Sequence, residues 1–311
     1  MEGKMKISVQ TGGLIDELGI EKCYKTIAEA GFEAIDWNLD HSLRPALINA
    51  GDCEGNCIFE KDMEEILDFY AEELTHIRKN GLKITQAHAP FPAYVIDKPW
   101  VLDYMIKIYK QMILFCDRVG CKNLVIHNFT APRNSEYDLA DEAMAIDDKL
   151  YTSLIPELLE TNVTVCLENL FGGSGATTFA GIGSEPEEAA KIIDRYNALA
   201  GKECFGYCLD TGHMNRLRHD PRRVIPILGS RLKALHIHDN AGEIDQHKAP
   251  YTGTVDWKAF YTALKTIGYK GDLSFETFNQ VRLGKDAEEL VEPWLRLIYL
   301  IGDHFRKKIL D

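Results

Sequence analysis

Residues 205–213 read FGYCLDTGH, and this stretch carries the pattern that decides the fold. It opens with a short apolar run, which is typical of a strand buried on both faces in a parallel sheet. The run ends at a carboxylate, Asp210, and a histidine follows three residues later at His213. Ionisable side chains at the end of a buried strand indicate a functional site there, because a rigid scaffold commonly positions functional groups at such ends.

The same pattern recurs along the whole chain. Short apolar runs alternate with longer amphipathic segments, as expected for repeated strand–helix units. The predicted strands are Lys6–Val9, Ala34–Trp37, Lys83–His88, Asn123–His127, Thr164–Glu168, Phe205–Asp210, Ala234–His238 and Asp272–Glu276. Each is followed by a predicted helix, and these are Ile20–Ala30, Lys61–Asn80, Pro99–Val119, Asp141–Leu159, Glu187–Ala200, Pro221–Leu228, Trp257–Ile267 and Ala287–Phe305. Eight strands and eight helices predict an α/β protein, a (β/α)₈ or TIM barrel.

We expect one domain over residues 1–311, because no linker or low-complexity tract divides the chain. Three connections are longer than an ordinary strand-to-helix loop, and they are Leu39–Glu60, Thr130–Ala140 and Asn240–Thr254. All three follow predicted strands. They are therefore expected as loop insertions over the end of the barrel that holds the active site.

The composition restricts the partners. With 35 basic and 48 acidic residues the formal charge is −13, which repels phosphate backbones and anionic membranes, so nucleic acid and membrane are both disfavoured. The first residues lack the apolar run of a signal peptide, and no segment is apolar enough to span a bilayer, so a cytoplasmic location is expected. The eight cysteines are scattered. For the pair Cys53 and Cys57, we expect a solvent-facing loop rather than a zinc site.

Six consecutive predicted strands, the third to the eighth, carry an imidazole or a carboxylate at or near their ends. These residues are His88, His127, Glu168, Asp210, His236 and Glu276, and the following loops add His213, Asp245 and His247. In a closed barrel these side chains converge on one axis. The residues two positions earlier are mostly small and suit the layer beneath, namely Gln86, Val125, Cys166, Cys208, Ala234 and Ser274.

Converging carboxylates need a counter-charge, because unpaired charge is costly to bury. No lysine or arginine occurs at the converging positions, so a divalent cation is the expected partner. The ligands are nitrogen and oxygen without a thiolate, which suits Mn²⁺, Mg²⁺, Co²⁺, Fe²⁺ or Zn²⁺.

The motifs LEN (167–169), LDTGH (209–213), HIHDN (236–240) and FET (275–277) together resemble the xylose isomerase-like barrel superfamily, also called AP endonuclease family 2. The resemblance to its ketose 3-epimerases implies a metal held by Glu168, Asp210, His236 and Glu276. It also implies a substrate-binding role for His213, and proton transfer by Glu168 and Glu276 on opposite faces of the substrate through an enediolate. The arginine that those epimerases place after the seventh-strand histidine is missing here, since Ala241-Gly242-Glu243 occupies that region.

The predicted function is a metal-dependent isomerase or epimerase acting on a sugar or sugar phosphate, with His88, His238 and Trp37 as further substrate-binding residues. The first alternative is a zinc-dependent phosphodiesterase of the abasic-site endonuclease type, whose nine ligands for three zinc ions all have counterparts here. That reading adds five ligands to the epimerase set, namely His88, His127, His213, Asp245 and His247. The second alternative is a non-catalytic sugar-binding barrel. The resemblance is also compatible with a homodimer.

Overall fold

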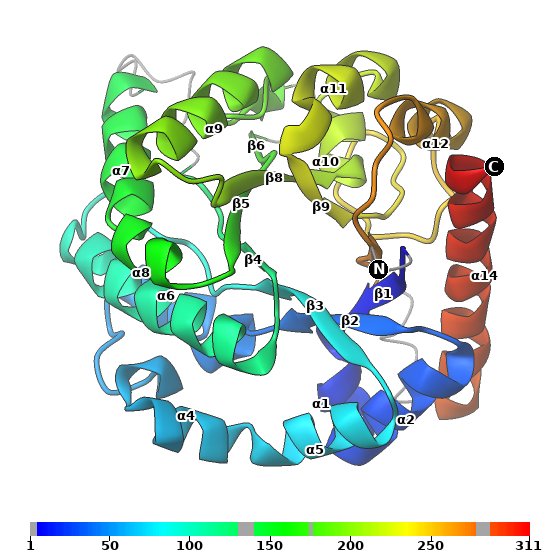
Figure 1. The fold of residues 1–311 in the computed structure, drawn as a ribbon, viewed down its shortest axis with the longest axis horizontal. Coiled ribbons are helices and arrows are strands. Elements are labelled where there is room, and N and C mark those ends of the chain that lie inside the picture. Colours follow the sequence, from blue (N-terminus) through cyan, green and yellow to red (C-terminus); the bar gives the residue numbers. More distant parts are fainter. Residues whose placement is uncertain (1–4, 130–139, 174–176, 278–286) are drawn as a thin grey trace.

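The computed structural model describes residues 5–129, 140–173, 177–277 and 287–311. Eight parallel strands form its central sheet, in the order β10-β1-β2-β3-β4-β5-β8-β9. Their bounds are β1 Ile7–Gln10, β2 Ala34–Asn38, β3 Lys83–His88, β4 Asn123–Val125, β5 Thr164–Glu168, β8 Phe205–Asp210, β9 Leu232–His236 and β10 Leu273–Phe275. A parallel bridge between Ile237 and Phe275 joins the two outer strands. The ring of strands with helices outside it (Figure 1) confirms the predicted (β/α)₈ barrel.

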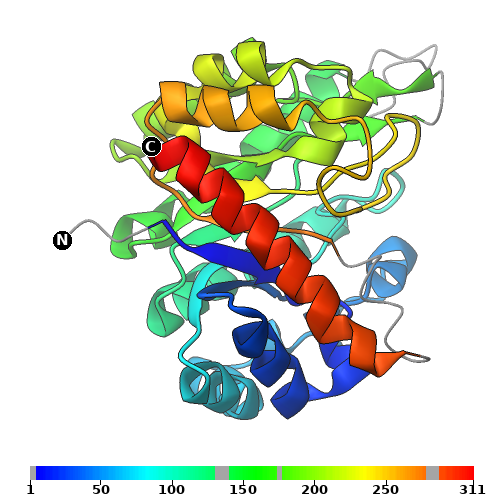
Figure 2. The ribbon, with the colours of Figure 1, turned by 90° about the vertical axis from the view of Figure 1, so that its right-hand side faces the viewer.

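The helices lie between the strands and cover the outside of the barrel. Their bounds are α1 Leu14–Leu18, α2 Ile20–Ala30, α3 Pro45–Ala50, α4 Met63–Phe69, α5 Ala71–Lys79, α6 Trp100–Val119, α7 Ala140–Thr152, α8 Ile155–Glu160, α9 Pro186–Ala200, α10 Thr211–Arg216, α11 Pro221–Leu228, α12 Trp257–Thr266 and α14 Val291–Leu310. Figure 2 shows α14 crossing the outer side of the barrel. None of the described helices is both long and apolar enough to cross a membrane.

Two predicted helices are each divided in the structure. The segment 61–80 breaks at Tyr70, whose buried ring packs against Trp37 and Phe115 at centroid distances of 5.0 and 5.2 Å. The segment 141–159 breaks before α8, which has Pro156 in its first turn. Proline lacks a backbone N–H and suits the start of a helix better than its interior.

The predicted loop insertions are only partly described. Residues 39–60 contain α3 and two 3₁₀ turns rather than an open loop. Cys53 and Cys57 are both buried there, so the prediction that they face solvent was wrong. They belong to the apolar core, which the sequence spacing did not reveal. Most of the insertion Thr130–Ala140 lies outside the described residues.

The predicted alternation along the strands positions the site. Val125, Cys166, Cys208 and Ala234 form a small apolar cluster of their own inside the barrel. The neighbouring residues of opposite parity, such as Leu167, belong to the large core between strands and helices. Because successive strand residues point to opposite faces, the residue two positions after each inner one points to the barrel axis at the strand end.

Candidate metal centre

A cavity of about 750 Å³ lies at the carboxyl ends of the strands. Its lining combines residues from both halves of the chain: Gln10, Gly12, Gly13, Asp16, Glu17, Asn38, Asp40, His88, Phe91, His127, Glu168, Leu170, Phe171, His213, Asp245, His247 and Glu276. This is where barrel enzymes place their active sites.

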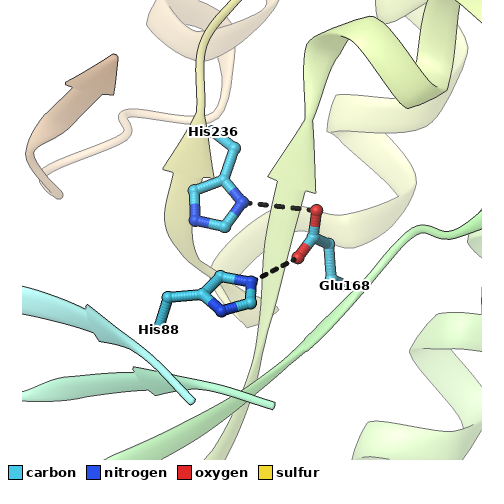
Figure 3. Close-up of side chains that lie close together, drawn as sticks. All are labelled: His88, Glu168 and His236. Carbon is cyan, nitrogen blue, oxygen red and sulfur yellow. Dashed lines mark ion pairs between the residues drawn. The ribbon is translucent and has the colours of Figure 1, made fainter. Parts of the chain in front are cut away.

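Glu168, at the end of β5, lies at the centre of the ionisable cluster. Its Oε1 lies 3.3 Å from Nδ1 of His213 and 3.3 Å from Nδ1 of His236. Its Oε2 lies 3.2 Å from Nε2 of His127 and 3.7 Å from Nε2 of His88. Figure 3 shows His88 and His236 reaching Glu168 from different strands. One carboxylate therefore faces four imidazoles. Because a single carboxylate cannot pair with all of their nitrogens, nitrogen lone pairs remain available to a cation.

Asp210 and Glu276 complete the wall around His236. Glu276 Oε2 lies 3.6 Å from His236 Nδ1, and Glu276 Oε1 accepts a hydrogen bond of 2.8 Å from the Gln10 side chain. Asp210 caps α10 by accepting the backbone N–H of His213 at 2.6 Å, which fixes that histidine at the cavity. Potential ligand atoms of Asp210, His236 and Glu276 lie within 4.8 Å of one another, as do those of His88, Glu168 and His236.

The long connection after β9 brings a further carboxylate and a further imidazole to the cavity. Asp245 Oδ2 lies 2.8 Å from His247 Nε2 and 3.3 Å from His213 Nε2. His247 has a φ of 44°, an unfavourable backbone conformation for a non-glycine residue that often marks functional sites. Its ring stacks on His238 at 4.0 Å between centroids.

Two further triplets involve these residues. Ligand atoms of His238, Asp245 and His247 lie within 4.8 Å of one another, and the same holds for Asp210, His213 and His238. Gly212 makes this packing possible, because a Cβ at that position would collide with the His238 ring. The clustering therefore extends beyond the four predicted ligands toward His213 and the loop at 245–247.

The two cavity glutamates differ in their electrostatic surroundings. Burial opposes ionisation of Glu168, but the charges of His236 and His127 outweigh it and hold its pKa well below the usual value. Burial raises the pKa of Glu276, and the nearby imidazoles offset this only in part. Glu168 therefore stays ionised, whereas Glu276 retains a proton more readily, and two carboxyl groups whose pKa values are shifted apart are typical of acid–base sites.

The donor set fits a divalent cation. Glu168 Oε2, His236 Nδ1 and Asp245 Oδ1 are buried and make no hydrogen bond within the described part of the chain. Buried polar atoms are nearly always satisfied, so these atoms indicate a missing partner. Nitrogen and oxygen ligands of this type suit Zn²⁺, Mn²⁺, Co²⁺ or Mg²⁺. The four-residue set of Glu168, Asp210, His236 and Glu276 stays a prediction.

Of the predicted substrate-binding residues, His88 and His213 line the cavity, whereas Trp37 and His238 do not. Trp37 points outward from β2 into the helix layer, where its indole N–H donates to Glu73 at 2.9 Å. His238 is fully buried beneath His247, and its Nε2 lies 2.9 Å from Asp210. Substrate binding by these two residues stays a prediction, since the first points away from the cavity and the second packs against His247 and Asp210.

Sequence reasoning missed the cavity wall that β1 and the segment after it supply. Gln10, Asp16 and Glu17 line the cavity, and Asp36 lies inside the barrel beneath it. Gln10 and Asp36 have the inward parity of their strands, so the alternation used for the later strands was the available signal. Asp16 and Glu17 belong to the short helix α1, for which no sequence pattern was recognised.

The chain is similar to a known family and to several known proteins. The model of the family described as "Xylose isomerase-like TIM barrel" matches residues 24–298. An uncharacterised protein (y4fM) of Sinorhizobium fredii is 26% identical over 277 residues, which are 83% of this chain and 81% of that protein. An L-ribulose 3-epimerase of Methylomonas sp. is 34% identical over 88 residues, 28% of this chain and 26% of the epimerase.

Solved structures show the same fold. A D-tagatose 3-epimerase-like protein is 20% identical with a TM-score of 0.66, over 94% of this chain and 98% of that one. The IOLI protein, solved with a bound zinc atom, is 16% identical with a TM-score of 0.68, over 99% of this chain and 100% of that one. A D-psicose 3-epimerase solved in the presence of D-fructose is 14% identical with a TM-score of 0.67, over 97% and 99% of the two chains.

Proposed function

This chain belongs to the xylose isomerase-like TIM barrel family, and we propose that it is a divalent-metal-dependent sugar isomerase or epimerase. One observation carries the proposal. The carboxylates of Glu168 and Glu276 both face the cavity and flank the same imidazole, with His236 Nδ1 at 3.3 Å from the first and 3.6 Å from the second. Two carboxylates beside one shared site can remove a proton from a bound carbon acid and return one.

The chain's own residues supply the proton transfer. In the proposed reaction Glu168 accepts the proton on the carbon beside the substrate carbonyl, which leaves an enediolate. Glu276, whose pKa burial raises, donates a proton to the carbon from its own side. Glu168, Asp210, His236 and Glu276 would hold the divalent cation, which would supply positive charge to stabilise negative oxygens of the substrate. Gln10 holds Glu276 through its 2.8 Å hydrogen bond.

The cavity lining favours an unphosphorylated sugar. No lysine or arginine is present among its described lining residues, whereas Asp16, Glu17 and Asp40 add carboxylates at its β1–β2 side. Carboxylates and the Asn38 amide suit hydroxyl groups, while a phosphate dianion would be repelled. The relatives whose names state a substrate act on sugars, among them L-ribulose and D-psicose.

The proposal is tested by proton exchange. The metal-loaded protein is incubated in D₂O with a panel of free ketoses and their phosphates, and deuterium on carbon is followed by NMR. We expect incorporation with a free sugar, and loss of it in Glu168→Gln and Glu276→Gln. The matched control is Glu73→Gln, a buried carboxylate outside the barrel, which should retain exchange. Sugar binding without exchange across the panel would contradict the enzyme proposal and favour a sugar-binding barrel.

A zinc-dependent phosphodiesterase is the second candidate, and the grouping of nine ligand residues favours it. His88 and His127 lie on one side of Glu168, and the pair Asp245 and His247 lies beyond His213. Three zinc ions per chain, together with nicking of a duplex that contains an abasic site, would establish this function instead. One ion per chain without nicking would support the isomerase.

A further inference from the structure

Asp36 is a buried carboxylate that the proton-transfer scheme does not use. It lies in β2 on the inner face of the barrel, fully buried, one layer below the cavity. It receives side chains from three other strands. Its Oδ2 accepts hydrogen bonds from Gln86 Nε2 at 2.5 Å and from Ser274 Oγ at 3.2 Å. The same oxygen lies 3.2 Å from His236 Nε2.

These contacts leave the charge of Asp36 uncompensated. Gln86 and Ser274 are neutral, and no lysine or arginine pairs with Asp36 in the described parts of the chain. Its Oδ1 has no hydrogen bond there either. An ionised carboxylate is strongly disfavoured in an apolar interior unless positive charge lies nearby. Among the described residues, the ionisable group in contact with Asp36 is the imidazole of His236.

His236 lies between two sets of carboxylates. Its Nε2 faces Asp36 below, and its Nδ1 faces Glu168 and Glu276 in the cavity. Neither ring nitrogen makes a regular hydrogen bond among the described residues. The ring thus lies between carboxylate oxygens at 3.2 Å on one side and at 3.3 and 3.6 Å on the other. A carboxylate behind a metal-binding histidine fixes the ring tautomer and makes the other nitrogen a better ligand.

We propose that Asp36 is the positioning residue of the metal centre: it receives the proton-bearing Nε2 of His236, so that the Nδ1 lone pair is directed at the cation. This inference rests on the proposed function, because it requires that a cation binds at the site. Gln86 and Ser274 act through Asp36 by holding its carboxylate beneath the ring. Asp36 itself contacts neither cation nor substrate.

The test measures cation affinity directly. Mn²⁺ or Zn²⁺ is titrated calorimetrically into the metal-free full-length protein, its Asp36→Asn variant and the control Glu73→Gln. We expect Asp36→Asn to weaken affinity by roughly 10- to 100-fold, Ser274→Ala to weaken it by a smaller factor, and Glu73→Gln to leave it unchanged. Circular dichroism establishes that each variant is folded. Should Asp36→Asn fail to fold, Ser274→Ala provides the comparison.

A second readout separates positioning from a merely structural role. In the zinc-loaded protein with ¹⁵N-labelled histidine, the nitrogen shifts of His236 should show a protonated Nε2 and a metal-bound Nδ1, and Asp36→Ala should remove this pattern. Wild-type affinity in Asp36→Asn would overturn the inference while leaving the proposed function intact. A wild-type protein that binds no divalent ion would overturn the proposed function first, and the role of Asp36 with it.

Discussion

Two buried glutamates show how differently this molecule treats the same side chain. Glu73 lies in α5 outside the barrel, and it accepts hydrogen bonds from the hydroxyl of Tyr24 at 2.5 Å and the indole N–H of Trp37 at 2.9 Å. Glu168 lies at the end of β5 inside it, among four imidazoles, with an oxygen that makes no hydrogen bond in the described chain. Both residues are almost inaccessible to water.

The two environments indicate different roles for the two carboxylates. The donors to Glu73 are a neutral hydroxyl and a neutral indole N–H of core residues, so their bonds to it contribute to stability. The groups around Glu168 are themselves ionisable, and none of them offers a fixed positive charge. Stability does not require so many titratable groups in one place, whereas a cation site does.

The largest expected effect is on catalysis at the site. Replacing Glu168 with Gln removes the proton acceptor and a cation ligand together, so we expect deuterium exchange to fall by about 10³-fold or more. The replacement should also lower stability to urea in the metal-free protein at neutral pH, because the depressed pKa of Glu168 shows that the folded state favours its ionised form. Exchange measured by NMR and unfolding measured by circular dichroism check the two halves. Exchange within tenfold of wild type would show that Glu168 is not the base.

The next effect is on stability and concerns the other glutamate. Glu73→Ala leaves the Tyr24 hydroxyl and the Trp37 N–H buried without an acceptor, at about 1–3 kcal/mol for each group. We therefore expect the free energy of unfolding in urea to fall by about 2–6 kcal/mol, with cation affinity unchanged. A loss of cation affinity equal to that of Glu168→Gln would remove the distinction between the two regions.

Cation binding should stabilise the folded chain. A ligand that binds the native state alone adds about 2.7 kcal/mol at a concentration of 100 times its Kd. Adding Mn²⁺ or Zn²⁺ at that level should stabilise wild type and Glu73→Ala by a similar free energy. The gain is measured as a rise in melting temperature, and chelation should reverse it. Glu168→Gln should show a much smaller gain. Equal gains in all three proteins would place the bound ion elsewhere.

The smallest effect is a pH dependence of cation binding. Burial opposes the charged form of His247, but Glu276 and Asp245 outweigh it and raise the pKa of His247 to about 9. The carboxylates of Asp210 and Asp245 likewise raise the pKa of His213 against the effect of burial. Near neutral pH a cation that binds these nitrogens must displace protons. Affinity should therefore increase as pH rises toward 9.

Calorimetry in two buffers of different ionisation enthalpy measures the number of protons released. We expect release in the wild type and a smaller release in His247→Gln. Uptake of protons on binding would contradict the predicted increase of affinity with pH. No release in either protein would show that the bound ion does not contact these imidazoles.

Much of the site was predictable because strand alternation is a local property. Glu168 ends β5 and points into the barrel, so Cys166, two residues earlier, is expected to point to the same side of the sheet. The apolar cluster around Cys166 confirms this orientation. The same rule applied to β2 would have directed attention to Asp36 and excluded Trp37 from the cavity. Trp37 attracted attention by residue type, but its side chain points into the helix layer.

The sequence alone determined the eight strand–helix units and the kind of ligand at each strand end, because periodicity and residue type are properties of short segments. Only the tertiary structure decided which atoms meet. The barrel closes between β9 and β10, and this brings Asp36 of β2 beneath His236 of β9, two residues 200 positions apart in sequence. The tertiary structure also brings His247 of the loop at 245–247 against the ring of His238. Contacts between distant segments depend on closure and side-chain direction, which no local pattern encodes.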